Sequence, residues 1–123
     1  MSYISGFLLA VPTANKDSYR RMAEASWAIF RDHGCLSTHE TWGVDVKDGK
    51  VTSFPMAVKK QDDETVVFSW MEWPDRETCD RAWEAMMADP RMKELGEMPF
   101  DGMRMMWGGF EPMFVARASD GAA

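Results

Sequence analysis

The residues best suited to chemistry are two charged side chains that stand in otherwise apolar, aromatic segments. Glu40 alternates with Trp42 in a strand-like run, so both side chains share one face of a strand. Arg104 lies in a run of Met and Trp and is the only basic residue between Lys93 and Arg117. Since a buried charge is costly unless it is paired, we expect Glu40 and Arg104 to contact each other, either as a structural ion pair or as the polar floor of a pocket. The candidate pocket residues are Glu40, Trp42, Trp70, Arg104 and Trp107.

The sequence contains none of the usual patterns for metal binding or covalent catalysis. His39 and Glu40 are adjacent in a predicted strand, so they point to opposite faces and do not chelate one ion. His33 is expected near a helix C-terminus, where a cation favours the helix dipole. There is no nucleophile elbow, and Gly108-Gly109 is not a phosphate loop because no helix follows it. We therefore expect no metal and no cofactor, and we assign no catalytic residue.

The two cysteines bear on the compartment in which the protein works. Cys35 and Cys79 are far apart and have no CxxC spacing. No basic segment precedes the first apolar run, and no run approaches the roughly 18 apolar residues of a membrane span. We expect free, buried thiols and a cytoplasmic location, although the sequence leaves a disulfide open.

The composition fits one globular domain and argues against several partners. The 123 residues are 46% hydrophobic and 28% charged, with a net charge of −6. Nucleic acid requires a concentrated basic surface, so neither nucleic acid nor a membrane is expected as a partner. Twelve Met and six Trp are unusually many, and they either fill the core or line an adaptable pocket or interface.

Hydrophobic spacing and turn signals predict the elements that position these residues. Asn15 and Asp75 are expected to cap two amphipathic helices, and Gly34 is expected to end the first. Pro55 makes residues 51–58 an extended edge or bulged segment rather than a central strand. Four strands are expected at 3–11, 36–46, 65–73 and 103–115, the last with a bulge or a close backbone approach at Gly108-Gly109, and a short helix at about 90–95.

The predicted order of elements is β-α-β-β-α-β. We therefore predict the α+β class with a ferredoxin-like sandwich, as a single domain over residues 1–117 followed by a disordered tail at 118–123. Two helices cover only one face of a four-stranded sheet, and the other face carries large apolar side chains. Burial of that face against a second copy predicts a C2 homodimer with sheet facing sheet in a shared barrel.

Four stretches of the sequence carry a resemblance to a known family. They are VTSFPMAVKK at 51–60, ETVVFSW at 64–70, MADPRM at 87–92 and MPFDGMRMMWGGFE at 98–111. Over nearly the whole chain, from about Tyr3 to Val115, the sequence resembles a bacterial family known only as domain of unknown function 1428. The resemblance implies a dimeric α/β barrel, a superfamily fold that also houses cofactor-independent monooxygenases. It implies no established activity.

These observations favour a small homodimeric cytosolic protein that binds an apolar or aromatic small molecule between the sheet and the helices. One alternative is a cofactor-independent monooxygenase or isomerase in the same pocket, with Glu40 or His39 as the base. A second alternative is a protein-interaction module whose helical faces dock a partner.

Overall fold

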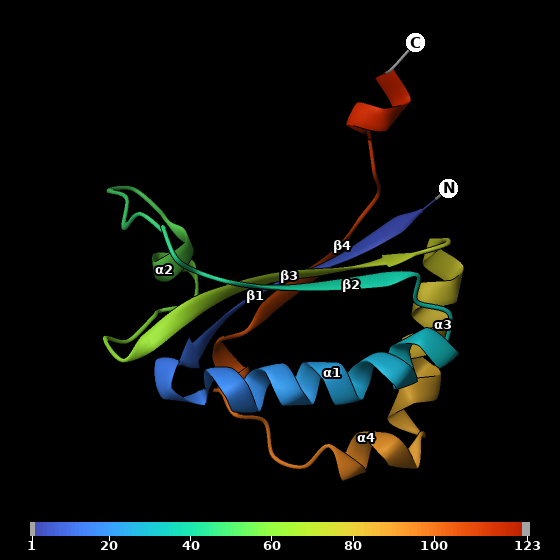
Figure 1. Cartoon of the computed structure of the whole chain (residues 1–123), viewed down its shortest axis with the longest axis horizontal. Helices are drawn as coiled ribbons and strands as arrows, with labels where there is room; N and C mark the ends of the chain where they lie inside the picture. The colour runs from blue at the N-terminus through green and yellow to red at the C-terminus, as the bar shows by residue number, and fades with distance from the viewer. Residues whose placement is uncertain (1, 122–123) are drawn as a thin grey trace.

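The computed structural model describes residues 2–121, and its elements follow the predicted order with one added helix (Figure 1). The elements are β1 (Tyr3–Pro12), η1 (Thr13–Asn15), α1 (Lys16–Asp32), β2 (Ser37–Trp42), α2 (Phe54–Ala57), β3 (Glu64–Trp73), α3 (Arg76–Met87), α4 (Pro90–Glu94), η2 (Gly102–Arg104), β4 (Met106–Phe110) and η3 (Ala118–Gly121). The tail that we predict to be disordered contains the short 3-10 helix η3, and residues 122 and 123 lie outside the described residues.

The four strands form one antiparallel sheet in the order β2-β3-β1-β4. The two ten-residue strands β1 and β3 are central and pair over their whole length, from Tyr3 opposite Trp73 to Pro12 opposite Glu64. With α1 and α3 as the two crossovers, this is the ferredoxin-like topology. The predicted α+β fold class is confirmed.

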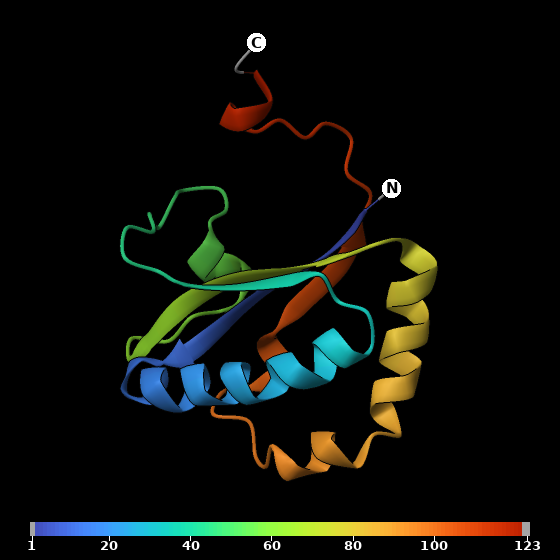
Figure 2. The same cartoon turned by 45° about the vertical axis from the view of Figure 1, so that its right-hand side comes forward.

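The sheet has two faces that are covered very differently (Figure 2). We call the side with α1, α3 and α4 the helix face, and the side with α2 and the C-terminal segment the open face. On the helix face, Leu9, Val11 and Val67 are buried against α1. Nearby, the fully buried Trp73 packs with Met86 of α3. The core therefore lies between the sheet and the helices, as two-layer packing requires.

Local hydrogen bonds explain where the helices begin and end. The Asp75 carboxylate accepts from the backbone N–H of Thr78 at 2.7 Å, so the predicted cap of α3 is confirmed. Asn15 precedes α1 as predicted, but its side chain does not cap the helix. Its amide instead donates to the Pro99 carbonyl at 3.0 Å. Gly34 follows α1 with a φ of 106°, a left-handed conformation that favours glycine.

The predicted extended segment at 51–58 is wrong, because part of it forms helix α2. The Ser53 hydroxyl accepts from the backbone N–H of Met56 at 3.1 Å and caps the helix. Pro55 lies in the first turn, where its missing N–H would have had no helical partner in any case. The proline therefore begins a helix here rather than marking a strand edge. Val58 follows and is buried on the open face.

Two predicted strands are shorter than expected. The strand predicted at 36–46 ends at Trp42, and the one predicted at 103–115 is reduced to β4. The glycine pair in β4 keeps regular register with β1, so the predicted bulge is wrong. The alternative, a close approach, is correct: a Cβ atom on Gly109 would lie 1.6 Å from the Tyr3 hydroxyl oxygen. Glycine leaves room there for the tyrosine side chain.

A cluster of charges joins the end of α1 to the start of α4. Nε2 of His33, at the predicted helix C-terminus, lies 3.1 Å from a carboxylate oxygen of Asp89. Arg91 contacts that carboxylate and also Asp32, in both cases at 2.8 Å. Hydrogen bonds from Arg91, then from His33, hold the pKa of Asp89 well below its usual range. The cluster fixes α4 against the first helix.

Within residues 2–121, no helix combines the length and the apolar character that crossing a bilayer requires. The same residues contain no group of three His, Cys, Asp or Glu side chains placed to hold a metal ion. Cys35 and Cys79 are both free and buried.

Candidate functional site

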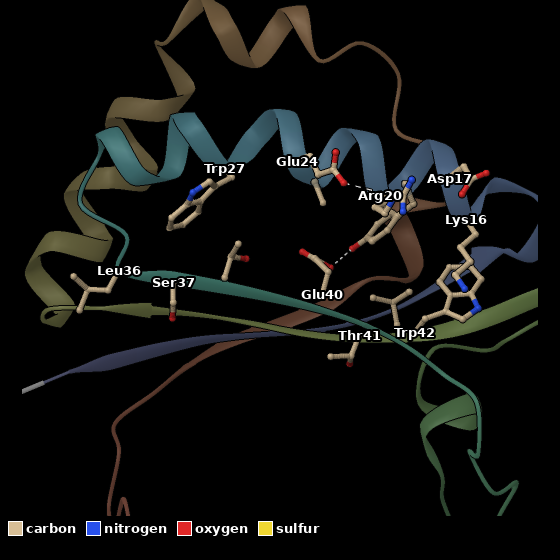
Figure 3. A pocket seen from close by; sticks show the side chains of 14 residues that line it. Lys16, Asp17, Arg20, Glu24, Trp27, Leu36, Ser37, Glu40, Thr41 and Trp42 are labelled. Atoms are coloured by element: carbon tan, nitrogen blue, oxygen red, sulfur yellow. Dashed lines mark hydrogen bonds and ion pairs between the residues drawn. The ribbon is translucent and has the colours of Figure 1, made fainter. Parts of the chain in front are cut away.

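A cavity of about 770 Å³ lies on the helix face between α1 and the edge strand β2 (Figure 3). This volume is in the range of small-molecule binding sites. Its lining comes from one side of α1, from β2 and from the neighbouring strand β3. The apolar part of the lining consists of Ala23, Trp27, Leu36, Trp42 and Val67. The cavity is therefore mostly apolar and opens at the edge of the sheet.

Glu40 is the polar centre of the cavity. It lies on β2 opposite Ser69 of β3, and its side chain points from the strand toward α1 (Figure 3). The Tyr19 hydroxyl, from the first turns of α1, donates to a carboxylate oxygen of Glu40 at 2.6 Å. Tyr19 is buried and its ring meets Phe100 edge to face, with centroids 5.7 Å apart. A rigid core residue thus orients a carboxylate that a ligand can reach.

The surroundings of Glu40 disfavour its charged form. Although the side chain is accessible from the cavity, the nearby protein removes water from the carboxyl group, and this desolvation raises its pKa. Hydrogen bonds from Tyr19 and Ser69 oppose the effect but do not cancel it. Burial, followed by the charge of Glu40, raises the pKa of the Tyr19 hydroxyl. Tyr19 therefore acts as a hydrogen-bond donor at physiological pH, and Glu40 is the group that can exchange a proton.

Exposed charges surround the mouth of the cavity. Arg20 and Glu24, one helical turn apart on α1, form an ion pair at 3.6 Å. The Lys16 ammonium lies 5.4 Å from the centre of the Trp42 ring, in a cation–π contact. The two cations at the mouth therefore already have partners other than Glu40.

The structure brings together two of the five predicted pocket residues, Glu40 and Trp42. Trp70 lies on the open face, where it stacks on His39 with ring centroids 4.6 Å apart. Trp107 lies on the helix face, but on β4 at the opposite edge of the sheet. There it lines a separate cavity of about 520 Å³ beside α3.

The predicted contact between Glu40 and Arg104 is wrong. Arg104 belongs to η2, before β4, and its guanidinium forms two bonds to Glu64, at 2.7 and 2.5 Å, and one to Asp101 at 3.0 Å. Strands β2 and β4 are the two edges of the sheet, so about 14 Å of sheet separates them. Arg104 is mostly buried and paired with acids, whereas Glu40 is exposed to the cavity and accepts a hydrogen bond from Tyr19. The Arg104–Glu64 pair is structural and ties η2 to the start of β3.

Sequence reasoning missed the partner and the neighbours of Glu40. Tyr19 and Trp27 are eight positions apart, a spacing that places them on one side of a helix, and both line the cavity from α1. The spacing of Lys16, Arg20 and Glu24 at intervals of four also shows that they share a side of the helix. Which strand faces that side depends on the order of strands in the sheet, and a helical pattern does not contain that information.

Comparison with known proteins assigns the chain to a family. The model of the family described as Protein of unknown function (DUF1428) matches residues 2–102. The chain belongs to this family. The uncharacterised protein YbaA of Escherichia coli K12 is 55% identical over 112 residues, which cover 90% of this chain and 96% of that protein. YbaA of Shigella flexneri gives the same values. The predicted DUF1428 resemblance is therefore confirmed, and these bacterial relatives have no characterised function.

Two solved structures are similar to this DUF1428 chain at low sequence identity. One is a mutant of SnoaB, a cofactor-independent oxygenase from Streptomyces nogalater, with 16% identity, a TM-score of 0.48 and coverage of 93% and 95% of the two chains. The other is the de novo designed protein Foldit4, with 13% identity, a TM-score of 0.46 and coverage of 91% and 99%. Similarities at this level carry no argument about function.

Proposed function

We propose that this protein binds an apolar or aromatic small molecule in the cavity between α1 and β2. The observation that carries the proposal is a cavity of about 770 Å³ whose apolar walls surround one oriented, desolvated carboxylate. Such a combination of apolar lining with a single convergent polar group is typical of ligand sites. A filled core would leave no such space beside Trp27 and Trp42.

A thermal-shift screen with a library of small aromatic compounds tests this proposal. We expect some compounds to raise the melting temperature of the wild-type protein and to lose this effect in Trp27→Ala, which removes one wall of the cavity. Trp107→Ala is the matched control, because that indole lines the other cavity. No stabilising compound, or equal effects of both substitutions, would contradict the proposal.

We also propose that the protein is a homodimer, formed through the open face of the sheet. Phe68, Met106 and Phe110 are about half exposed on that face. The segment after β4 leaves the body on the same side (Figure 2) and exposes Met113 and Phe114 almost completely. A second copy is the occupant that would cover these residues symmetrically.

The exposed surface area of the chain is consistent with an interface to a second copy. A compact monomer of 14.0 kDa exposes about 6,700 Å². This chain exposes 8673 Å². The surplus of about 2,000 Å² exceeds the roughly 800 Å² that each partner buries in a standard interface.

Sedimentation equilibrium at micromolar concentration tests the dimer. We expect twice the chain mass for the wild type and a monomer for Phe68→Glu, which places a charge in the middle of the open face. Met87→Glu is the matched control, since Met87 is an exposed apolar residue of α3, away from the open face. A wild-type monomer, or dissociation by both substitutions, would contradict the proposal.

The free thiols support a cytosolic location, which we propose as well. Cys35 and Cys79 are both unpaired, as is usual in a reducing compartment.

Proton transfer by Glu40 is a second candidate function, favoured by its accessible carboxyl group and raised pKa. In an isomerase or a cofactor-independent oxygenase, this carboxylate would remove a proton from an aromatic substrate. Oxygen consumption with a panel of aromatic diols tests the oxygenase reaction. We expect activity that Glu40→Gln abolishes, and no consumption by the wild type would contradict it.

A further inference from the structure

The charges that line the cavity are unevenly compensated. Arg20 and Glu24 pair with each other, and Lys16 lies over an indole ring. Asp17 lies in the first turn of α1, where the helix dipole favours a negative charge. Among the described residues, Glu40 accepts a hydrogen bond from the neutral hydroxyl of Tyr19, and Ser69, opposite it on β3, is neutral as well. Within the described part of the chain, no Lys, Arg or His lies at ion-pair distance from it. The centre of the cavity thus holds a negative group that lacks a cation.

Two indole rings lie on either side of this carboxylate. Figure 3 shows Trp27 and Trp42 on opposite sides of Glu40, both beside the cavity. Indole faces attract cations, and the Lys16 ammonium already lies over the Trp42 ring at 5.4 Å. The walls of the cavity are therefore suited both to an apolar body and to a positive charge.

We propose that the ligand of this cavity is an organic cation, such as a protonated primary amine on an aromatic or aliphatic body, whose charged group contacts Glu40 while its body lies between Trp27 and Trp42. This inference rests on the proposed binding function and names the class of ligand. A cation at Glu40 supplies the missing ion-pair partner, and its N–H groups form charge-assisted hydrogen bonds to the carboxylate. An anion would face that carboxylate directly, and a neutral compound would leave it uncompensated.

Binding of a cation also implies release of a proton. Desolvation raises the pKa of Glu40 in the empty cavity, so part of the population carries a proton near that pKa. An ammonium group favours the ionised carboxylate and lowers its pKa. The affinity for an amine should therefore increase as the pH rises through the titration of Glu40, and up to one proton should leave for each amine bound in that range.

Three compounds with the same indole body and different side-chain ends test the inference by isothermal titration calorimetry. They are tryptamine, which is cationic, tryptophol, which is neutral, and indole-3-propionate, which is anionic. We expect tryptamine to bind about tenfold more tightly than tryptophol, and the propionate to bind most weakly. Glu40→Gln should reduce tryptamine to the affinity of tryptophol and leave tryptophol unchanged. Glu84→Gln, at an exposed acid of α3 that does not line the cavity, is the matched control and should preserve the preference.

Wild-type protein supplies a second measurement that does not depend on the folding of a variant. The released proton is taken up by the buffer, and phosphate and Tris have different enthalpies of ionisation. The binding enthalpy of tryptamine should therefore differ between the two buffers. Equal affinities for the three compounds, or a preference that survives Glu40→Gln, would overturn the cation inference and leave the proposed binding function standing. Failure of all three compounds to bind would overturn both.

Discussion

Replacing Tyr19 by Phe isolates the hydrogen bond that orients Glu40, because it removes one hydroxyl group and keeps the ring. The ring retains its edge-to-face contact with Phe100 and its packing on Leu9 and Val67. The substitution removes a 2.6 Å bond to a carboxylate. Hydrogen bonds to charged groups contribute about 1.5–3 kcal/mol. We expect Tyr19→Phe to lower the free energy of unfolding by that amount at a pH above the raised pKa of Glu40, where the carboxylate is ionised.

The loss should become smaller in acid. At about pH 4, Glu40 is largely protonated in the folded protein because its pKa is raised, and the bond then joins two neutral groups worth about 0.5–1.5 kcal/mol. Urea denaturation followed by tryptophan fluorescence at both pH values measures the difference. Tyr3→Phe, at the other tyrosine of the chain, is the control and should show no such pH dependence. An equal loss at both pH values, or a loss below about 0.5 kcal/mol at the higher pH, would refute the role assigned to this bond.

Three further predictions can be tested in the same denaturation assay. In the wild type, the unfolded chain ionises at the ordinary carboxyl pKa, whereas Glu40 in the folded protein keeps its proton to a higher pH. The stability of the wild type therefore decreases as the pH rises between the ordinary and the raised pKa, and Glu40→Gln should abolish this decrease. An unchanged pH profile would count against this. Arg104→Met should destabilise the protein above the ordinary carboxyl pKa, because it leaves the buried Glu64 without its partner. Adding Glu64→Leu to this variant should recover part of the lost stability. Additive losses from the two substitutions would show that the residues act independently. Trp83→Ala should cost about 3 kcal/mol, because its ring contacts Phe30 and two other aromatic rings, and a cost below about 1 kcal/mol would show that this contact contributes little.

The topology of the sheet could be predicted because each central element carries a strong local signal. Strand β3 was expected at 65–73 from its β-branched and aromatic residues, and it spans Glu64–Trp73. Helix α1 was expected from apolar spacing between Asn15 and Gly34, and it spans Lys16–Asp32. The errors occur at residues that are compatible with two different local structures. Pro55 disfavours a strand interior and also favours the first turn of a helix, and the sequence alone did not decide between them.

The candidate site was less predictable than the fold because its contacts depend on which strands are neighbours. Glu40 was identified as a carboxylate that shares a strand face with Trp42, and both line the cavity. Two strands separate its strand from that of Trp107, so residues with similar chemistry belong to different cavities. Tyr19, the partner of Glu40, is 21 positions away and belongs to another element. A pattern within one segment does not identify such a pair.

The position of Glu40 on an edge strand has a consequence for the solubility of the protein. In the part of the chain that the structure describes, β2 pairs only with β3, so its outer row of backbone groups faces away from the sheet. Exposed edges of this kind invite strands of other chains to extend the sheet, and a short strand with an inward-pointing charge discourages them. β2 has six residues, and its glutamate points inward toward α1. An added strand would bring apolar side chains beside that carboxylate. An apolar replacement of Glu40 would therefore make the protein more prone to aggregate along this edge, even if the replacement raised the free energy of unfolding.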